Sequence, residues 1–421
     1  MTIYKELKAR FATFEALKAW FATEEGGRLT VRDGGDSALA LIHYDKETSN
    51  MAAPHVEHFR SVIWNKETNS LVCAGPCRGR KFSDAVDKAL SVGECVAEEF
   101  IDGVMINMFW HGDDWQLATR TQIGAHCRYY STDSHFDELF WTTFKDSGLT
   151  TDVLNKEFCY SWVLQHPKER IVVAPAHGIP RIYLVEVSMI IVDGGRILAG
   201  VSDALKRFVP ARYNLSSLEA VKEHVTTWGR RLGHQYQGVV LKSGDKRWKL
   251  RTNQYDEARH LRGNCPNRGY RWLELWGESK LGKYLRLYPE EDADANSLIG
   301  RYKDLTQELH RRYVEIYRDR RYPLGEAPHK FRKLLWELHQ AGSGTYFPKV
   351  REFMNLQDTA RKLWLINYEL RYGADHNPAP VAKRQLKADA TGGGGAALGA
   401  DGKADNPDRP TGGAGAAADS K

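Results

Sequence analysis

The architecture of this 421-residue chain can be predicted outward from one stretch, Glu98-Glu99-Phe100-Ile101-Asp102-Gly103-Val104-Met105-Ile106. An Asp-Gly turn in this stretch leads into a β-rich run that continues to Trp110. The turn His111-Gly112-Asp113-Asp114 then joins that run to Trp115-Gln116-Leu117-Ala118-Thr119. Two β-rich runs that a short Gly-Asp turn connects predict a β-hairpin.

Short β-rich runs continue on both sides of this hairpin, from about 28 to 260, and Gly, Asp and Asn separate them. The clearest of these runs are 61–64, 170–173, 181–187 and 238–241. One helix is predicted near 214–232, behind the capping candidates Ser216 and Ser217. Apolar residues spaced three and four apart predict an amphipathic helix over the first 25 residues. The sequence therefore predicts an α+β domain built on antiparallel sheet.

From about residue 270 the apolar spacing becomes helical, in three stripes over 298–317, 331–338 and 350–364. A Gly- and Ala-rich tail follows Tyr372, and we expect it to be disordered because it holds too few apolar residues to bury. The predicted order is an N-terminal helix with its lead-in, a sheet domain, a basic helical domain and the tail, over 1–55, 56–262, 263–372 and 373–421.

The composition is typical of a globular protein, with 42% hydrophobic and 27% charged residues. Because no apolar stretch reaches about 18 residues, we expect no membrane-spanning helix. The charged N-terminus predicts no secretory signal, and six scattered cysteines indicate a reducing, cytoplasmic location. Cys73 and Cys77 have no second pair of ligands nearby, so we predict no metal site from them.

The net charge of +6 falls on one segment, because 301–372 holds 15 Lys and Arg against nine Asp and Glu. A basic helical surface suits the phosphate backbone of RNA, and Arg311 and Arg312 are the candidate contacts. The alternative is a solvated helix surface that binds nothing.

Three further segments accompany the first one and carry polar residues at strand positions. They are the run 158–173, the run Gln237-Gly238-Val239-Val240-Leu241, and the run Arg247-Trp248-Lys249-Leu250-Arg251-Thr252-Asn253-Gln254-Tyr255. Together with Arg120 behind the hairpin, their order and spacing resemble the covalent nucleotidyltransferase superfamily, which comprises ATP-dependent RNA and DNA ligases and capping guanylyltransferases. The closest resemblance is to phage- and virus-type RNA ligases. It covers about residues 56–260 and implies an antiparallel-sheet, ATP-grasp-like ligase domain.

The resemblance implies a nucleotide pocket formed by Glu98, Asp102, Gly103, Arg120, Gln237, Lys249 and Arg251. Glu98 corresponds to the acid near the adenine, and Arg120 to a contact with ribose or phosphate. Lys249 and Arg251 alternate on one predicted strand, so they share a face and suit a triphosphate or a nucleic-acid end. ATP with Mg²⁺ or Mn²⁺ and an RNA partner are implied by the resemblance alone. The alternative is an ordinary Asp-Gly turn and a solvated strand face.

The chain departs from the family at three positions. The family has a lysine that attacks the α-phosphate of ATP and carries AMP, and Phe100 stands at that position. Val163 and Gln237 stand where the family has carboxylates. Three other lysines, Lys81, Lys242 and Lys249, are alternative nucleophiles. Transfer without a covalent intermediate, through a bound metal and Asp102, is a further alternative.

The sequence thus predicts an RNA-ligase-like protein that uses ATP to join or repair RNA ends. The alternative is a catalytically inactive ligase-like module that binds nucleotide or RNA, in which Phe100 fills the space of the lysine.

Overall fold

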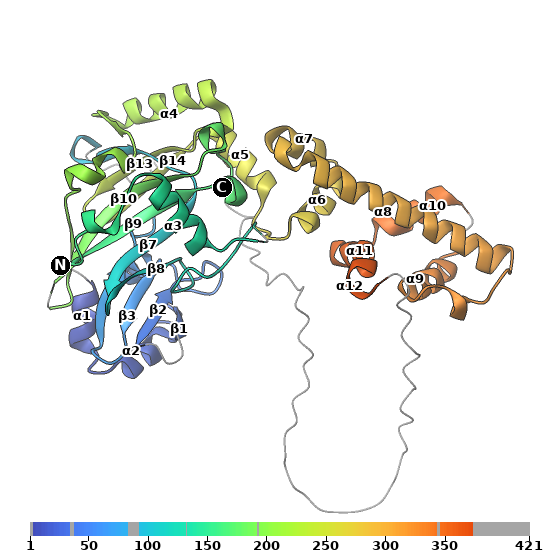
Figure 1. Ribbon diagram of the computed structural model, residues 1–421, viewed down its shortest axis with the longest axis horizontal. Helices are drawn as coiled ribbons and strands as arrows, with labels where there is room; N and C mark the ends of the chain where they lie inside the picture. Colours follow the sequence, from blue (N-terminus) through green and yellow to red (C-terminus); the bar gives the residue numbers. More distant parts are fainter. Residues whose placement is uncertain are drawn as a thin grey trace, which may run out of the picture. The chain divides into compact units, whose positions relative to one another are not determined.

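The computed structural model describes residues 3–33, 38–82, 92–131, 133–191, 193–342 and 346–373. The chain forms two compact units that divide between Gly263 and Asn264 (Figure 1). Unit 1 combines antiparallel sheets with helices and unit 2 is helical, which confirms the predicted α+β class. Within these residues, none of the helices has both the length and the apolar character needed to span a bilayer. The tail beyond Gly373, which we expected to be disordered, lies outside the described residues.

The first sheet of unit 1 is antiparallel, in the order β1-β2-β3-β4. Its strands are Thr30–Asp33, Leu39–His43, Val62–Asn65 and Ser70–Ala74. Two helices, α1 (Ile3–Arg10) and α2 (Phe14–Phe21), pack on it through an apolar cluster. The prediction of one continuous helix is wrong here, because the Thr13 hydroxyl accepts a hydrogen bond from the Ala16 amide and starts a second helix.

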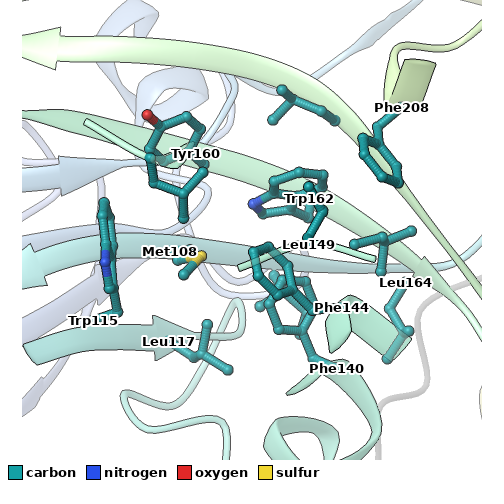
Figure 2. Packing of buried hydrophobic residues seen from close by; sticks show 14 of the residues in the cluster. Met108, Trp115, Leu117, Phe140, Phe144, Leu149, Tyr160, Trp162, Leu164 and Phe208 are labelled. Atoms are coloured by element: carbon teal, nitrogen blue, oxygen red, sulfur yellow. The ribbon is translucent and has the colours of Figure 1, made fainter. Parts of the chain in front are cut away.

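The second sheet has the order β11-β10-β9-β7-β8. Its strands are, in that order, Arg196–Leu198, Arg181–Ile190, Phe158–Gln165, Val104–His111 and Asp114–Ala118. The last two confirm the predicted hairpin. Helix α3 (Phe136–Asp146) packs Phe140 and Phe144 against Trp162 on one face of this sheet (Figure 2). The segment between Asp133 and Asn155 therefore belongs to the sheet domain.

The third sheet carries the candidate site and has the order β12-β6-β13-β14-β5. Its strands are, in that order, Arg212–Tyr213, Val96–Glu99, Gly238–Ser243, Lys246–Arg251 and Arg80–Lys81. All its pairings are antiparallel except that of β14 with β5. Helix α4 (Leu218–Leu232) lies over β13 and β14 (Figure 1) and begins at Ser217, as predicted. Because strand side chains alternate, the residues on the other face of the sheet point away from α4.

One predicted strand is absent. The run Arg170-Ile171-Val172-Val173 forms no strand in the described structure. The amides of Val172 and Val173 instead donate hydrogen bonds to the Asp102 carboxylate, each over 2.9 Å. A side chain therefore satisfies the backbone groups that a sheet partner would otherwise bind.

Helix α5 (Asn253–Arg262) follows β14 and closes unit 1. Unit 2 is helical, with α6 to α12 spanning Arg268–Gly277, Leu281–Leu287, Asp292–Tyr313, His329–Gln340, Phe347–Asn355, Thr359–Ile366 and Tyr368–Tyr372. Leu309 and Leu335, on the first two predicted stripes, are buried in its core. The third stripe is two helices rather than one, because the Asp358 side chain accepts from the Ala360 amide and caps α11.

Candidate functional site

The face of the third sheet opposite α4 brings together four of the residues that the sequence singled out, Glu98, Lys242, Lys249 and Arg251. In register, Val240 of β13 pairs with Glu98 of β6 on one side and with Lys249 of β14 on the other. Arg251 follows two residues after Lys249 on the same strand, so both side chains point to this face, as the alternation predicts. We call this face, with Glu98, Val240, Lys242, Lys249 and Arg251, the inner face.

Lys249 and Arg251 of the inner face belong to a group of seven cationic side chains, each of which lies within electrostatic range of at least one other member, and we call this group the cationic cluster. They are Lys46, Arg60, Arg78, Arg120, Lys249, Arg251 and Arg259. Among the described residues, the one carboxylate that forms an ion pair with any of them is Asp256, at 3.7 Å from Arg251. The cluster therefore presents a strong excess of positive charge.

Four members of the cationic cluster were missed by sequence reasoning. Lys46, Arg60 and Arg78 lie in loops of the first ~80 residues, and Arg259 lies on α5. No local motif marks these four residues, because each lies in its own segment and the tertiary fold brings them together. Arg120, which the resemblance did indicate, lies with its guanidinium carbon 5.7 Å from the ring centre of Tyr44.

Lys249 is the most strongly perturbed amine of the inner face. Burial lowers its pKa most, the neighbouring cations Arg251 and Lys46 lower it further, and the pKa falls to about 7. Burial and nearby positive charges lower the pKa of Arg251 as well. An amine with a pKa near 7 is substantially unprotonated at neutral pH, and an unprotonated amine is a nucleophile.

Lys242 and Glu98 are engaged with each other on the same face. The Lys242 ammonium group donates to the Glu98 carboxylate and, over 2.8 Å, to the backbone oxygen of Val185. Glu98 is almost fully buried and also accepts from Nε of Arg212 at 3.1 Å. Both residues thus link neighbouring strands, and their charges are compensated within the protein.

Asp102 is likewise fully engaged. One carboxylate oxygen accepts the two amide hydrogen bonds from Val172 and Val173, and the other accepts from the Tyr255 hydroxyl at 2.7 Å. Gly103 follows it at a close approach, since a Cβ atom there would lie 2.4 Å from the backbone oxygen of Leu164. The Asp-Gly turn therefore anchors α5 and the 170–173 segment to the sheet.

Phe100 is partly buried and lies beside Arg251. The Phe100 amide donates to the backbone oxygen of Gly238 at 2.9 Å, and Gly238 pairs with Arg251 on β14. The guanidinium carbon of Arg251 lies 5.4 Å from the centre of the Phe100 ring and 5.5 Å from that of Tyr255. The guanidinium group is thus in contact range of two aromatic rings.

The remaining predicted residues are spread more widely. Gln237 is buried, and its Oε1 atom has no hydrogen-bond partner among the described residues. Val163 is buried on β9. Lys81 is exposed on β5, where its Cα pairs with that of Lys249. The structure therefore distinguishes the three candidate lysines, since Lys242 is ion-paired, Lys81 is exposed and Lys249 lies in the cationic cluster.

The two candidate RNA contacts lie on α8 of unit 2. Arg312 forms an ion pair with Glu308 at 2.8 Å, and Arg311 lies 3.8 Å from the same carboxylate. Arg311 also lies 3.7 Å from Glu315, and its side chain is 61% exposed. Arg311 is therefore the more accessible of the two for a ligand.

The side chains of the site do not form a metal centre by themselves. In the described part of the chain, no three His, Cys, Asp or Glu residues are grouped so that they could hold a metal ion. Asp102 and Glu98 already accept hydrogen bonds from protein donors.

No protein-family model matches the chain, and no curated protein matches it. Solved structures do resemble it. A putative ATP-dependent DNA ligase from Aquifex aeolicus is 16% identical with a TM-score of 0.39, over 68% of this chain and 76% of that one. An archaeal ATP-dependent RNA ligase is 13% identical with a TM-score of 0.39, over 90% and 93%. A Naegleria gruberi RNA ligase variant with AMP and Mn is 12% identical with a TM-score of 0.31, over 44% and 57%. Assignment of a function therefore depends on the residues of the site.

Proposed function

We propose that the inner face binds the triphosphate of ATP, and that this chain is an RNA-ligase-like protein that joins or repairs RNA ends. The observation that carries the proposal is the cationic cluster, in which seven cations form one ion pair among the described residues, that of Arg251 with Asp256, and have Asp102 and Asp45 as further nearby carboxylates. Repulsion between like charges makes such a cluster unfavourable on its own. A polyanion removes that repulsion and gains charge-assisted hydrogen bonds.

Lys249 is the residue that suits nucleotidyl transfer. Its unprotonated amine would attack the α-phosphorus of ATP through the Nζ lone pair, forming a P–N bond. The P–O bond to the β-phosphate breaks, pyrophosphate leaves, and the nitrogen loses a proton to solvent. Burial and the neighbouring cations, which lower the pKa of Lys249 to about 7, supply the unprotonated amine. The same cations would stabilise the negative charge that develops on the leaving pyrophosphate.

The test is incubation of the purified protein with α-labelled ATP and Mg²⁺ or Mn²⁺, followed by a denaturing gel. The expected result is a labelled band that acid removes and base does not, which identifies a lysyl phosphoramidate. Peptide mapping should place the label on Lys249, and Lys249→Ala should remove it. A label that maps to Lys81 or Lys242 would contradict the assignment of Lys249 while retaining the activity.

The second candidate function is a ligase-like module that binds nucleotide or RNA without catalysis. Specific observations favour it. By the register that the resemblance implies, Phe100 takes the place of the family's lysine, and the carboxylates of Glu98 and Asp102 are occupied by protein donors. ATP-dependent thermal stabilisation without any labelled band would support this module. If ATP neither stabilises the protein thermally nor labels it, the proposal of a nucleotide pocket is contradicted.

A further inference from the structure

Phe100 occupies a position from which it can act on the phosphate-binding cations. Across the sheet, Phe100 at the end of β6, Gly238 of β13 and Arg251 of β14 form one row. Position 238 does not accommodate a residue larger than glycine, because a Cβ atom there would lie 1.9 Å from the backbone oxygen of Leu250. With no side chain between them, the Phe100 ring reaches across to Arg251, at 5.4 Å.

Arg251 is held by ring contacts more than by hydrogen bonds. Its Nε atom is buried and has no hydrogen-bond partner among the described residues, and its ion pair with Asp256 is long, at 3.7 Å. The Tyr255 ring also lies close, at 5.5 Å from the guanidinium carbon. Tyr255 is itself fixed, because its hydroxyl donates to the buried Asp102.

We propose that Phe100 is a positioning residue, whose ring holds the Arg251 guanidinium in the cationic cluster so that Arg251 can bind the phosphates of the ligand. This inference rests on the proposed function, because it assumes that the inner face binds ATP. It assigns a role to a side chain that has no nucleophilic chemistry of its own. It also predicts that lysine at this position destabilises the ligand-free protein, because a further cation would lie beside Arg251 and Lys249.

The experiment is a titration of ATP against the wild-type protein and a set of Phe100 variants, at one pH and one salt concentration. Phe100→Leu keeps the apolar volume but removes the ring, and should raise Kd roughly tenfold. Phe100→Tyr keeps the ring and should stay within about twofold of wild type. Melting temperatures without ligand identify any variant that fails to fold.

A double-mutant cycle separates positioning from a general structural effect. If Phe100 acts through Arg251, then Phe100→Leu should add little to the loss caused by Arg251→Met, so the two effects should be clearly less than additive. Additive effects, or wild-type affinity in Phe100→Leu, would overturn the inference while the proposed function stands. A wild-type protein that binds no ATP would overturn both.

Discussion

Replacement of Lys249 by methionine should stabilise the ligand-free protein. The amine lies in the cationic cluster, where burial and then Arg251 and Lys46 lower its pKa from 10.5 to about 7. Each unit by which the pKa is lowered corresponds to about 1.4 kcal/mol, so the charged Lys249 side chain destabilises the folded protein by at most roughly 5 kcal/mol. Solvent screens a half-buried side chain, and we therefore expect a gain of about 1 to 2 kcal/mol in the free energy of unfolding.

The sign of the pH dependence follows from the lowered pKa. Between about pH 7 and 10.5 the unfolded chain binds the Lys249 proton more strongly than the folded chain does. The stability of the wild type should therefore rise with pH through this window. The advantage of Lys249→Met should be largest below pH 7, where the folded protein must carry the buried charge. It should shrink steadily toward pH 10.5.

Calorimetry of the ligand-free proteins at pH 6.5 and 9.5 measures this effect. For a unit of this size, 1 to 2 kcal/mol corresponds to an increase of roughly 2 to 6 °C in Tm at pH 6.5. Lys246→Met is the matched control, because Lys246 is exposed on the same strand and points to the opposite face, so its Tm should change little. If the Tm of Lys249→Met at pH 6.5 equals that of the wild type or lies below it, the argument that the charged Lys249 destabilises the folded protein is refuted.

Three further predictions concern other parts of the molecule. If unit 2 binds RNA, Arg311→Glu should weaken RNA binding and reduce its salt dependence in a titration series, and adding Arg312→Glu should weaken binding further. Unchanged affinity with an unchanged Tm would show that these arginines are solvated and do not contact RNA. Asp102→Ala removes the acceptor of two amides and one hydroxyl, and should lower the urea-unfolding free energy by about 3 to 5 kcal/mol; a loss below 1 kcal/mol would contradict the anchoring role. Burial alone would raise the pKa of Glu186, but the neighbouring cations Arg247 and Arg196 outweigh burial and lower the pKa to about 2. Because the unfolded chain takes up this proton first, about 2 to 3 kcal/mol of the free energy of unfolding should be lost as pH falls from about 4.5 to 2. Glu186→Gln should abolish that dependence in acid unfolding followed by circular dichroism, and an unaltered acid profile would exclude the contribution.

Local sequence signals predicted elements whose stability depends on neighbouring residues. The hairpin of β7 and β8 follows from its Gly-Asp turn, and α4 begins at the predicted cap Ser217. Predictions from the same signals were wrong where a side chain formed a hydrogen bond with the backbone. Thr13 interrupts the predicted N-terminal helix, and Asp102 binds amides of the 170–173 run that its β-branched residues suggested as a strand. Residue pattern alone does not reveal the hydrogen bonds of Asp102, because donor and acceptor lie some 70 residues apart, whereas the Thr13 cap is a local signal.

The sequence by itself determined the α+β class and the shared face of Lys249 and Arg251, because both follow from strand and helix periods that are local properties of the chain. Only the tertiary structure decided which charges are compensated. It pairs Lys242 with Glu98, and it brings Lys46, Arg78 and Arg259 from separate segments around Lys249. The pKa of an amine depends on the distance and burial of its neighbours, and those quantities exist only once the chain has folded.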